Sequence, residues 1–396
     1  MKKKILFVFP KMTIGGATTS TLSILSVLSE MQDYEVDLLL LQHTGPLMDN
    51  IPKKVHVLPP AYAGNKRYLK YRKLCSVRSI LTRIKAYMCK ICTKNPYVVT
   101  QMNEKDTVRY CRKTDTLYDV AIAGMELWPL YYVSENVKAK KKVAWIHVNY
   151  EKTELKASVD QEAFDKMDEI VTVSPECKES FLHVFPGLSG KVIAIENLIS
   201  PQMIKQMAEE SCDLHVNPEK VNFITVARLD NKSKAFERTI PIFKKLVEEE
   251  HLSDWRWYIV GDGPDKEAIQ ELIRKQELQE YILLLGEQIN PYKYIKKCDY
   301  FLLLSYYEGK PISVAEAQIL GVIPVVTEYD SAESQTQNGR YGYVCGNCEN
   351  DIYECLKAVL QGWIDKQKIC SNLKNYALLQ DETKCKIRNI VENNAK

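Results

Sequence analysis

Short apolar runs alternate with longer mixed segments along the whole chain. Runs of this kind, bounded by polar residues, glycine or proline, predict strands that are covered on both faces of a parallel sheet. They lie at residues 5–9, 36–41, 55–58, 118–124, 142–147, 169–173, 191–195, 221–226, 257–260, 281–286, 300–305 and 323–327. Most of the segments between them are long enough for helices, so the pattern predicts an α/β fold.

The pattern also indicates how the chain is divided. A length of 396 residues suggests two domains of ordinary size. We place the first domain at residues 1–195 and the second at 221–375. Residues 196–220 between them are expected to form the crossover.

One stretch, residues 300–327, combines a strand, a loop, a helix and a second strand. Pro311 fits the first position of the helix, where its missing N–H costs nothing. Lys310 is then the expected N-cap, and lysine is a poor cap. An uncapped helix start behind Gly309 predicts an anion-binding site.

Two carboxylates belong to this stretch. Glu316 falls inside the apolar stripe that Ile312, Ala315 and Ile319 form on the predicted helix. A buried carboxylate is costly unless it has a partner, and a pair of ligand hydroxyls would serve. Glu308 lies in the preceding loop at the carboxyl end of a strand, where open α/β sheets bind ligands.

Glu308 and Glu316 stand in the segment EGKPISVAEAQILGVIPVV, whose flanking residues are Gly309, Pro311, Ala317, Gly321 and Pro324. This segment resembles the signature of the family 4 retaining glycosyltransferases. The resemblance implies a GT-B fold, an α/β architecture of two facing Rossmann-like domains with a deep interdomain cleft. It also implies a C-terminal tail, 376–396, that crosses back to the first domain. It places Glu308 beside the donor sugar and Glu316 on the ribose hydroxyls of the nucleotide. The alternative is a surface loop glutamate and a salt-bridged helix glutamate.

A basic loop opens the predicted second domain. Arg228 follows the strand at 221–226, and Lys232 and Lys234 come next in the same loop. Arginine and lysine at a strand end can bind a diphosphate. The loop resembles the family's Arg–Leu…Lys–Gly segment, with Ala235 where glycine is usual, which favours Lys234 over Lys232 without deciding between them. A solvated basic loop is the alternative.

The first domain offers weaker candidates. Gly15 and Gly16 let the backbone approach a ligand at a helix start, and the resemblance places them at the donor phosphates; the alternative is a plain tight turn. His147 ends a strand, and the resemblance places it near the donor sugar, as a catalytic group that bonds the sugar or steadies the leaving diphosphate; the alternative is a structural histidine. Glu126 and Trp128 are candidates for the acceptor side, and loop packing explains them equally well.

Residues 61–100 contain ten basic residues and no acidic one: Lys66, Arg67, Lys70, Arg72, Lys73, Arg78, Arg83, Lys85, Lys90 and Lys94. Apolar residues recur within it at three- and four-residue steps: Leu74, Val77, Leu81, Ile84, Met88 and Ile91. This predicts a basic amphipathic helix that can lie on an anionic membrane surface. The alternative is a core-packed helix with a solvated basic face. Nucleic acid is not expected as a partner, because no recognised binding motif accompanies the charge.

Charge and composition restrict the remaining possibilities. The net charge is +9 over residues 1–195 and −6 over the rest, so the first half is expected to face an anionic partner. No run of about 20 apolar residues exists, and the apolar part of MKKKILFVFP is too short for a signal peptide. We therefore expect a cytoplasmic protein, peripheral on the inner face of the cell membrane.

The cysteines and acidic residues give little support to a metal. Twelve scattered cysteines are typical of a reducing compartment, and the pairs Cys89/Cys92 and Cys345/Cys348 lack a matching histidine spacing for zinc. No Asp-x-Asp pair occurs in the sequence. We expect no metal and no cofactor other than the sugar nucleotide as co-substrate.

The predicted activity is metal-independent, retaining transfer of a sugar, with a UDP-sugar as the favoured donor. The acceptor is expected to be a hydroxyl of a glycan or lipid-linked glycan in surface polysaccharide assembly. One alternative is a non-catalytic sugar-nucleotide or glycan-binding subunit, since Lys310 replaces a usual aromatic or apolar residue and a usual glycine pair is missing after residue 327. Another is a dehydrogenase or methyltransferase, against which the incomplete glycine fingerprint at 261–264 argues.

Overall fold

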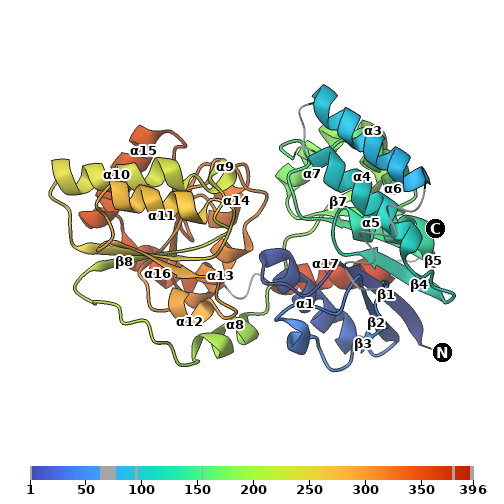
Figure 1. The fold of residues 1–396 in the computed structure, drawn as a ribbon. Coiled ribbons are helices and arrows are strands. Elements are labelled where there is room, and N and C mark those ends of the chain that lie inside the picture. The colour runs from blue at the N-terminus through green and yellow to red at the C-terminus, as the bar shows by residue number, and fades with distance from the viewer. Residues whose placement is uncertain (1, 63–76, 94–96, 154, 377–379, 393–396) are drawn as a thin grey trace. The chain divides into compact units, whose positions relative to one another are not determined.

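The computed structural model describes the chain except for residues 1, 63–76, 94–96, 154, 377–379 and 393–396. The chain forms two compact units (Figure 1). The first is Met1–Leu198 together with Glu382–Lys396, and the second is Ile199–Asp381. Each unit has its own parallel sheet; buried apolar residues form two clusters in the first unit and one in the second.

The sheet of the first unit has seven parallel strands in the order β3-β2-β1-β4-β5-β6-β7. Their bounds are β1 Lys3–Phe9, β2 Tyr34–Leu40, β3 His56–Val57, β4 Leu117–Ala123, β5 Lys138–Ile146, β6 Glu169–Thr172 and β7 Val192–Ala194. Strand order reverses between β1 and β4, and this pair forms the switch point where open α/β sheets bind ligands.

Helices cover both faces of this sheet (Figure 1). Ile5 and Phe7 of β1 pack with α1 (Gly16–Glu30) and α17 (Gln380–Glu392), whereas Leu6 and Val8 pack with α5 (Trp128–Asn136) and α6 (Ala157–Asp165). The strand reads as a continuous apolar run because alternate side chains enter two different cores. The other helices are α3 (Val77–Thr93), α4 (Tyr97–Thr107) and α7 (Pro175–Val184).

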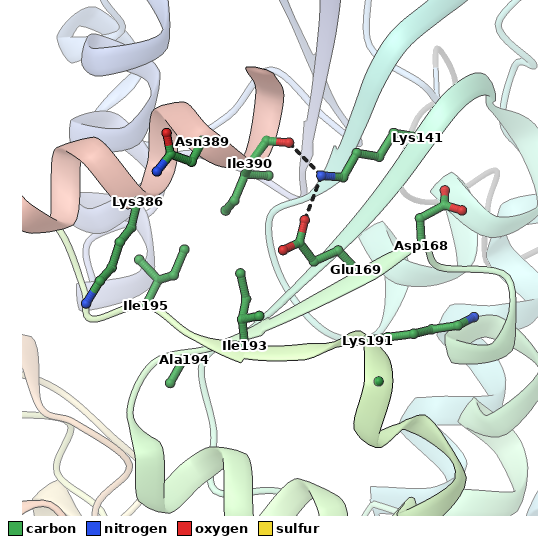
Figure 2. A pocket seen from close by; sticks show the side chains of 11 residues that line it. Lys141, Asp168, Glu169, Lys191, Ile193, Ala194, Ile195, Lys386, Asn389 and Ile390 are labelled. Atoms are coloured by element: carbon green, nitrogen blue, oxygen red, sulfur yellow. Dashed lines mark hydrogen bonds and ion pairs between the residues drawn. The ribbon is translucent and has the colours of Figure 1, made fainter. Parts of the chain in front are cut away.

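The C-terminal helix α17 is held to the first unit by polar contacts with two strands. Lys141 of β5 donates from Nζ to the carbonyl of Ile390 at 2.7 Å and pairs with Glu169 of β6 at 2.7 Å (Figure 2). The hydroxyl of Tyr34 donates to the carbonyl of Val391 at 3.0 Å. These bonds fix the end of the chain against the amino-terminal part of β5, inside the segment 376–396.

The sheet of the second unit has six parallel strands in the order β10-β9-β8-β11-β12-β13. Their bounds are β8 Val221–Val226, β9 Trp255–Val260, β10 Ile282–Gly286, β11 Tyr300–Leu303, β12 Ile323–Thr327 and β13 Tyr343–Cys345. Here the strand order reverses between β8 and β11.

The helices of the second unit also lie on two faces, with α10, α11 and α15 on one and α12, α13 and α16 on the other (Figure 1). Their bounds are α8 Pro201–Ala208, α9 Asn231–Lys234, α10 Phe236–Glu249, α11 Lys266–Lys275, α12 Tyr292–Ile295, α13 Ile312–Leu320, α14 Ala332–Thr336, α15 Glu349–Leu360 and α16 Lys366–Leu373. The segment expected as a crossover, 196–220, contains α8, which packs against α12 and α13.

Every predicted apolar run overlaps a strand, and the α/β prediction is confirmed. The edge strand β13 was not predicted. It has only three residues, and Tyr343 and Val344 are half-buried, so no apolar run marks it in the sequence.

Helix α3 presents its apolar side chains to solvent. Six of them lie on one face and are 41–62% exposed: Ile80, Leu81, Ile84, Tyr87, Met88 and Ile91. The alternative of a core-packed apolar face is therefore wrong for the described part of this helix. Six of the ten basic residues of the 61–100 segment lie outside the described residues: Lys66, Arg67, Lys70, Arg72, Lys73 and Lys94.

Candidate active site

Two neighbouring strands carry the donor-side candidates of the second unit. Arg228 and Lys234 follow β8, and Glu308 follows β11. These strands flank the point where strand order reverses, and their carboxyl ends meet at one edge of the sheet. Residues that are far apart in the sequence are therefore brought to one place.

Lys234 and Glu308 form an ion pair across this switch point. Both side chains are largely buried, with 17% and 11% of their surface exposed. The hydroxyl of Ser305 also donates to Glu308 Oε1, at 2.7 Å. Burial, and after it the negative charge of Glu308, raises the pKa of Tyr329 well above its usual value. Glu308 is thus held by a cation and a hydroxyl in a largely buried site.

The backbone after Lys234 explains the register of the basic loop. Ala235 separates α9 from α10 in a left-handed conformation with φ 53°, which glycine adopts more easily than alanine. A glycine at this point is what the resembling segment would carry, so the geometry supports matching Lys234 to its lysine. Arg228 is exposed on the same loop, and Lys232 is exposed as well.

Glycines support this loop from the next strand. A Cβ on Gly261 or Gly263 would overlap the carbonyl oxygens of Ala227 and Leu229. The N–H of Leu229 donates to the carbonyl of Asp262 at 3.0 Å, so the two loops lie backbone to backbone. The Gly-Asp-Gly turn at 261–263 therefore packs directly against the backbone of the loop that contains Arg228.

The start of α13 differs by one residue from the prediction. Pro311, with φ −67° and ψ 120°, is the N-cap, so the expectation that Lys310 caps the helix is wrong. Proline adopts this extended conformation readily, because its ring fixes only φ. No described side chain caps the first turn, so its N–H groups remain available to an anion. Gln335 of α14 donates to the Pro311 carbonyl at 2.8 Å and holds this start in place.

Glu316 lies inside the second unit, on the buried side of α13. It is 5% exposed, and Tyr292 Oη donates to its Oε1 at 2.8 Å. Burial raises the pKa of Glu316 to about 7, against the opposing effect of the Tyr292 hydrogen bond. The carboxyl group is therefore poised between its two protonation states near neutral pH.

In the first unit, Gly15 and Gly16 form the start of α1, the helix that follows β1. Gly15 is the N-cap with φ 153°, and an added Cβ would meet nothing within 4 Å. No described side chain caps α1. The glycine is therefore needed for its backbone conformation, and the space beside it is open.

His147 follows β5, which is the strand next to β4 and so lies beside the β1/β4 switch point of the first unit. Its ring Nε2 lies 3.1 Å from the Gly124 carbonyl oxygen, and its backbone N–H donates to Glu126 Oε2 at 3.2 Å. A carbonyl only accepts, so Nε2 carries the hydrogen and Nδ1 is the acceptor in the neutral ring. Burial lowers the pKa of His147 to about 4, so the ring is neutral at pH 7. A neutral imidazole suits a hydrogen bond to a sugar better than charge stabilisation of a diphosphate.

The two acceptor candidates are both buried in this structure. Glu126 is 5% exposed, and burial raises the pKa of its carboxyl group. Trp128 is 1% exposed and its ring packs against Tyr132 at 5.0 Å. Between them Leu127 has φ 67°, a conformation that is strained for a branched side chain and that is common at functional sites.

Three residues of the site were not predicted: Tyr292, Ser305 and Tyr329. Tyr292 lies in a helix of four residues, and its bond to Glu316 arises only when α12 packs on α13. No periodicity or motif could have indicated this contact. Ser305, by contrast, stands three residues before Glu308 and could have been suspected from that spacing.

Among the described residues, no group of three or more metal-binding side chains is found. The side chains of Cys89 and Cys92 lie outside that description. An open pocket of about 490 Å³ lies elsewhere, beside Lys141 and Glu169 in the first unit. It lies at the amino ends of β5 and β6 (Figure 2), whereas His147, a candidate of the same unit, follows the carboxyl end of β5.

Comparisons with known proteins show which sequences and structures this chain is similar to. Residues 207–379 match the family model of the glycosyl transferases group 1. An uncharacterized glycosyltransferase of Methanocaldococcus jannaschii is 31% identical over 40% of this chain and 39% of its own length. An N-acetylgalactosaminyltransferase of Campylobacter jejuni, named for a diphospho-undecaprenol acceptor, is 30% identical over 50% of this chain and 52% of its own. The chain thus spans about half or less of the length of these relatives.

Solved structures show the same fold over the whole chain. HepE of Anabaena, in complex with UDP, matches with a TM-score of 0.65 at 14% identity and covers 99% of both chains. A TarM variant of S. aureus, whose complex includes UDP, matches with a TM-score of 0.70 at 12% identity over 99% of this chain and 100% of the other. The parallel sheets and these structural neighbours show that the chain has the GT-B fold, and its residues 207–379 match the glycosyl transferases group 1 model.

Proposed function

We propose that this protein transfers a sugar from a nucleoside-diphosphate sugar, with UDP as the expected nucleotide, to a hydroxyl of a glycan acceptor with retention of configuration. The observation that carries the proposal is the pairing of Lys234 with Glu308 at the switch point of the second unit, beside the uncapped start of α13. The UDP in the complexes of HepE and TarM supports the choice of nucleotide.

Each polar group near the switch point has a proposed task. Arg228, Lys234 and the N–H groups of Gly309, Lys310 and the first turn of α13 bind the diphosphate. Glu308 orients the sugar, and Glu316 accepts hydrogen bonds from the ribose hydroxyls. Glu316 lies on the same helix as these N–H groups, so the proposed nucleoside and phosphate contacts would share one rigid element.

The chemical step breaks the bond between the anomeric carbon and the diphosphate oxygen, which leaves with the electron pair. The acceptor oxygen forms the new bond on the same face of the sugar, and its proton passes to the leaving diphosphate. The developing negative charge needs preorganised donors, which Arg228, Lys234 and the helix N–H groups supply. In the first unit Gly15, Gly16 and neutral His147 are proposed to contact the donor, and Glu126 the acceptor side.

We propose that no metal ion takes part, since the protein itself supplies cations for the diphosphate. Activity is expected to survive EDTA. Loss of activity on chelation, followed by recovery with Mg²⁺ or Mn²⁺, would overturn this part of the proposal.

We further propose that the protein works at an anionic membrane surface on a lipid-linked or surface-polysaccharide acceptor. No described helix is long and apolar enough to cross a bilayer. The exposed stripe of α3, from Ile80 to Ile91, belongs to a segment with ten basic residues and no acidic one. Apolar side chains that enter the headgroup region and cations that attract anionic lipids are the two requirements for interfacial binding. The name of the Campylobacter jejuni relative, which includes an undecaprenol-linked acceptor, agrees with such a location.

The experiment that tests the donor site is thermal-shift measurement with UDP, GDP, ADP, CMP and dTDP. Binding to the folded protein must raise its melting temperature by mass action. We expect a shift with UDP that is lost in Glu316→Ala. No shift with any nucleotide would contradict the proposed site. A shift without turnover on a mixed acceptor pool would instead favour the non-catalytic binding subunit.

A further inference from the structure

Tyr292 and Glu316 form a buried pair between two helices of the second unit. Tyr292 Oη donates to Glu316 Oε1 at 2.8 Å, and each residue is 5% exposed. The donor comes from α12 and the acceptor from α13, which pack against each other. The pair therefore depends on the relative placement of two separate elements.

The backbone at Tyr292 is itself held by a buried side chain. Asn290 is 8% exposed; its Oδ1 accepts from the Tyr292 N–H at 3.1 Å. Its Nδ2 donates to the carbonyl of Met207 in α8 at 2.8 Å. Helix α8 packs against both α12 and α13. The three helices thus hold the Tyr292 hydroxyl at a fixed point on the Glu316 carboxyl group.

We propose that Tyr292 is a positioning residue of the nucleotide site, which holds the Glu316 carboxylate in one orientation and in its ionised form for hydrogen bonds from the nucleoside hydroxyls. This inference rests on the proposed function, in which Glu316 contacts the nucleotide. It assigns Tyr292 no contact with the ligand and no part in the chemical step.

Burial and hydrogen bonding act on Glu316 in opposite directions. Burial disfavours the charged form and brings the pKa of Glu316 to about 7, while the Tyr292 hydrogen bond lowers it. Hydroxyl groups donate to a carboxylate more strongly than to a neutral acid. Nucleotide binding should therefore strengthen as pH rises through 7, and loss of the Tyr292 hydroxyl should move that transition to higher pH.

The other titratable groups on the packed elements make their contacts elsewhere. On α12, Lys293 lies 5.6 Å from the ring centroid of Tyr294, whose hydroxyl donates to Gln288 at 3.1 Å. Lys205 of α8 is exposed, and Tyr300 of β11 lies near Lys366. Strand β12 contains no titratable side chain. Tyr292 is accordingly the polar group to remove.

The test measures UDP affinity by calorimetry between pH 5.5 and 8.5 for wild type, Tyr292→Phe, Tyr294→Phe and Glu316→Gln. Phenylalanine keeps the ring packing and removes only the hydroxyl. For Tyr292→Phe we expect UDP affinity at pH 7 to fall about three- to tenfold. The midpoint of the pH dependence of UDP affinity should rise by about half a pH unit or more. Tyr294→Phe on the same helix should match wild type. Glu316→Gln should show only the titration of the ligand phosphate.

A Tyr292→Phe variant with the wild-type midpoint and affinity would overturn the inference while leaving the nucleotide site intact. If wild type does not bind UDP, the proposed donor is contradicted instead. The role of Tyr292 is then decided without ligand, by infrared titration of the Glu316 carboxyl against the Glu316→Gln spectrum. An unchanged carboxyl titration in Tyr292→Phe would overturn it, and an upward shift would support it.

Discussion

Lys234 and Glu308 are ion-paired although 73 residues separate them in the sequence, because they follow the two adjacent strands β8 and β11. A lysine proposed for the diphosphate and a glutamate proposed for the sugar thus neutralise each other in this structure. Donor binding would place the phosphate charge beside Lys234 and leave Glu308 free to contact sugar hydroxyls. The pair therefore connects the lysine and the glutamate of the proposed donor site.

The first prediction concerns this pair. Glu308→Gln should lower kcat about a hundredfold or more while UDP affinity changes little, because the loss falls on the sugar in the reacting state. Lys234→Met should weaken UDP binding itself, since it removes a cation from the diphosphate. Lys232→Met, at an exposed position of the same loop, serves as the matched control and should stay within about twofold of wild type. Steady-state kinetics and UDP calorimetry together separate these outcomes. A larger loss of UDP affinity in Lys232→Met than in Lys234→Met would make Lys232, and not Lys234, the diphosphate-binding lysine.

The second prediction concerns the apolar face of α3. Replacing Leu81 and Met88 with serine should reduce sedimentation with anionic vesicles at least tenfold, because two exposed apolar side chains no longer enter the interface. Leu117→Ser is the control, since Leu117 is also 59% exposed but lies on β4. Neutral vesicles should bind less than anionic ones. Undiminished binding of the double variant would remove α3 from the proposal.

The third prediction concerns the attachment of α17. Lys141→Met should speed hydrogen exchange in α17 and destabilise the first unit by about 2 kcal/mol, because a buried cation bonded to Glu169 and to the Ile390 carbonyl is lost. Lys140→Met is the neighbouring control. Lys140 pairs with Asp119 but its side chain is 66% exposed, so its loss should cost under about 1 kcal/mol. Equal effects of the two variants would show that burial of Lys141 is not what matters.

The fourth prediction concerns pH. The pKa of His147 is lowered to about 4 in the folded protein, below its usual unfolded value of about 6.5. As pH falls from 6.5 toward 4, His147 binds a proton in the unfolded chain before it does so in the folded protein. The unfolding free energy that depends on His147 is therefore complete above pH 6.5 and is lost between pH 6.5 and 4. His147→Gln should show a smaller loss of unfolding free energy over that range. His183→Gln, at a side chain that is 71% exposed, should show the same decrease in unfolding free energy as the wild type over that pH range. Denaturant titrations at pH 4.5, 5.5 and 7 decide between these results.

The sequence indicated that candidate residues share a site where those residues are local, but it did not indicate the contacts between distant candidates. Glu308, Gly309, Pro311 and Glu316 occupy one loop and one helix, so their spacing, together with the flanking residues and the family resemblance, indicated a shared site. Tyr292 was missed because α12 has four residues and shows no periodicity. The helix start was placed one residue early because the sequence shows the proline but not its ψ angle.

The sequence by itself determined the α/β class and the positions of most strands, because a strand buried on both faces must be apolar at nearly every residue. It also determined the helix that contains Glu316 and the loop before it that contains Glu308, since local spacing fixes which residues share a loop and a helix face. Only the tertiary structure decided that Lys234 pairs with Glu308, that Tyr292 reaches Glu316 and that the apolar face of α3 is exposed. Those relationships depend on which strands are neighbours and which helix faces are covered, and neither is encoded in the spacing of residues along one segment.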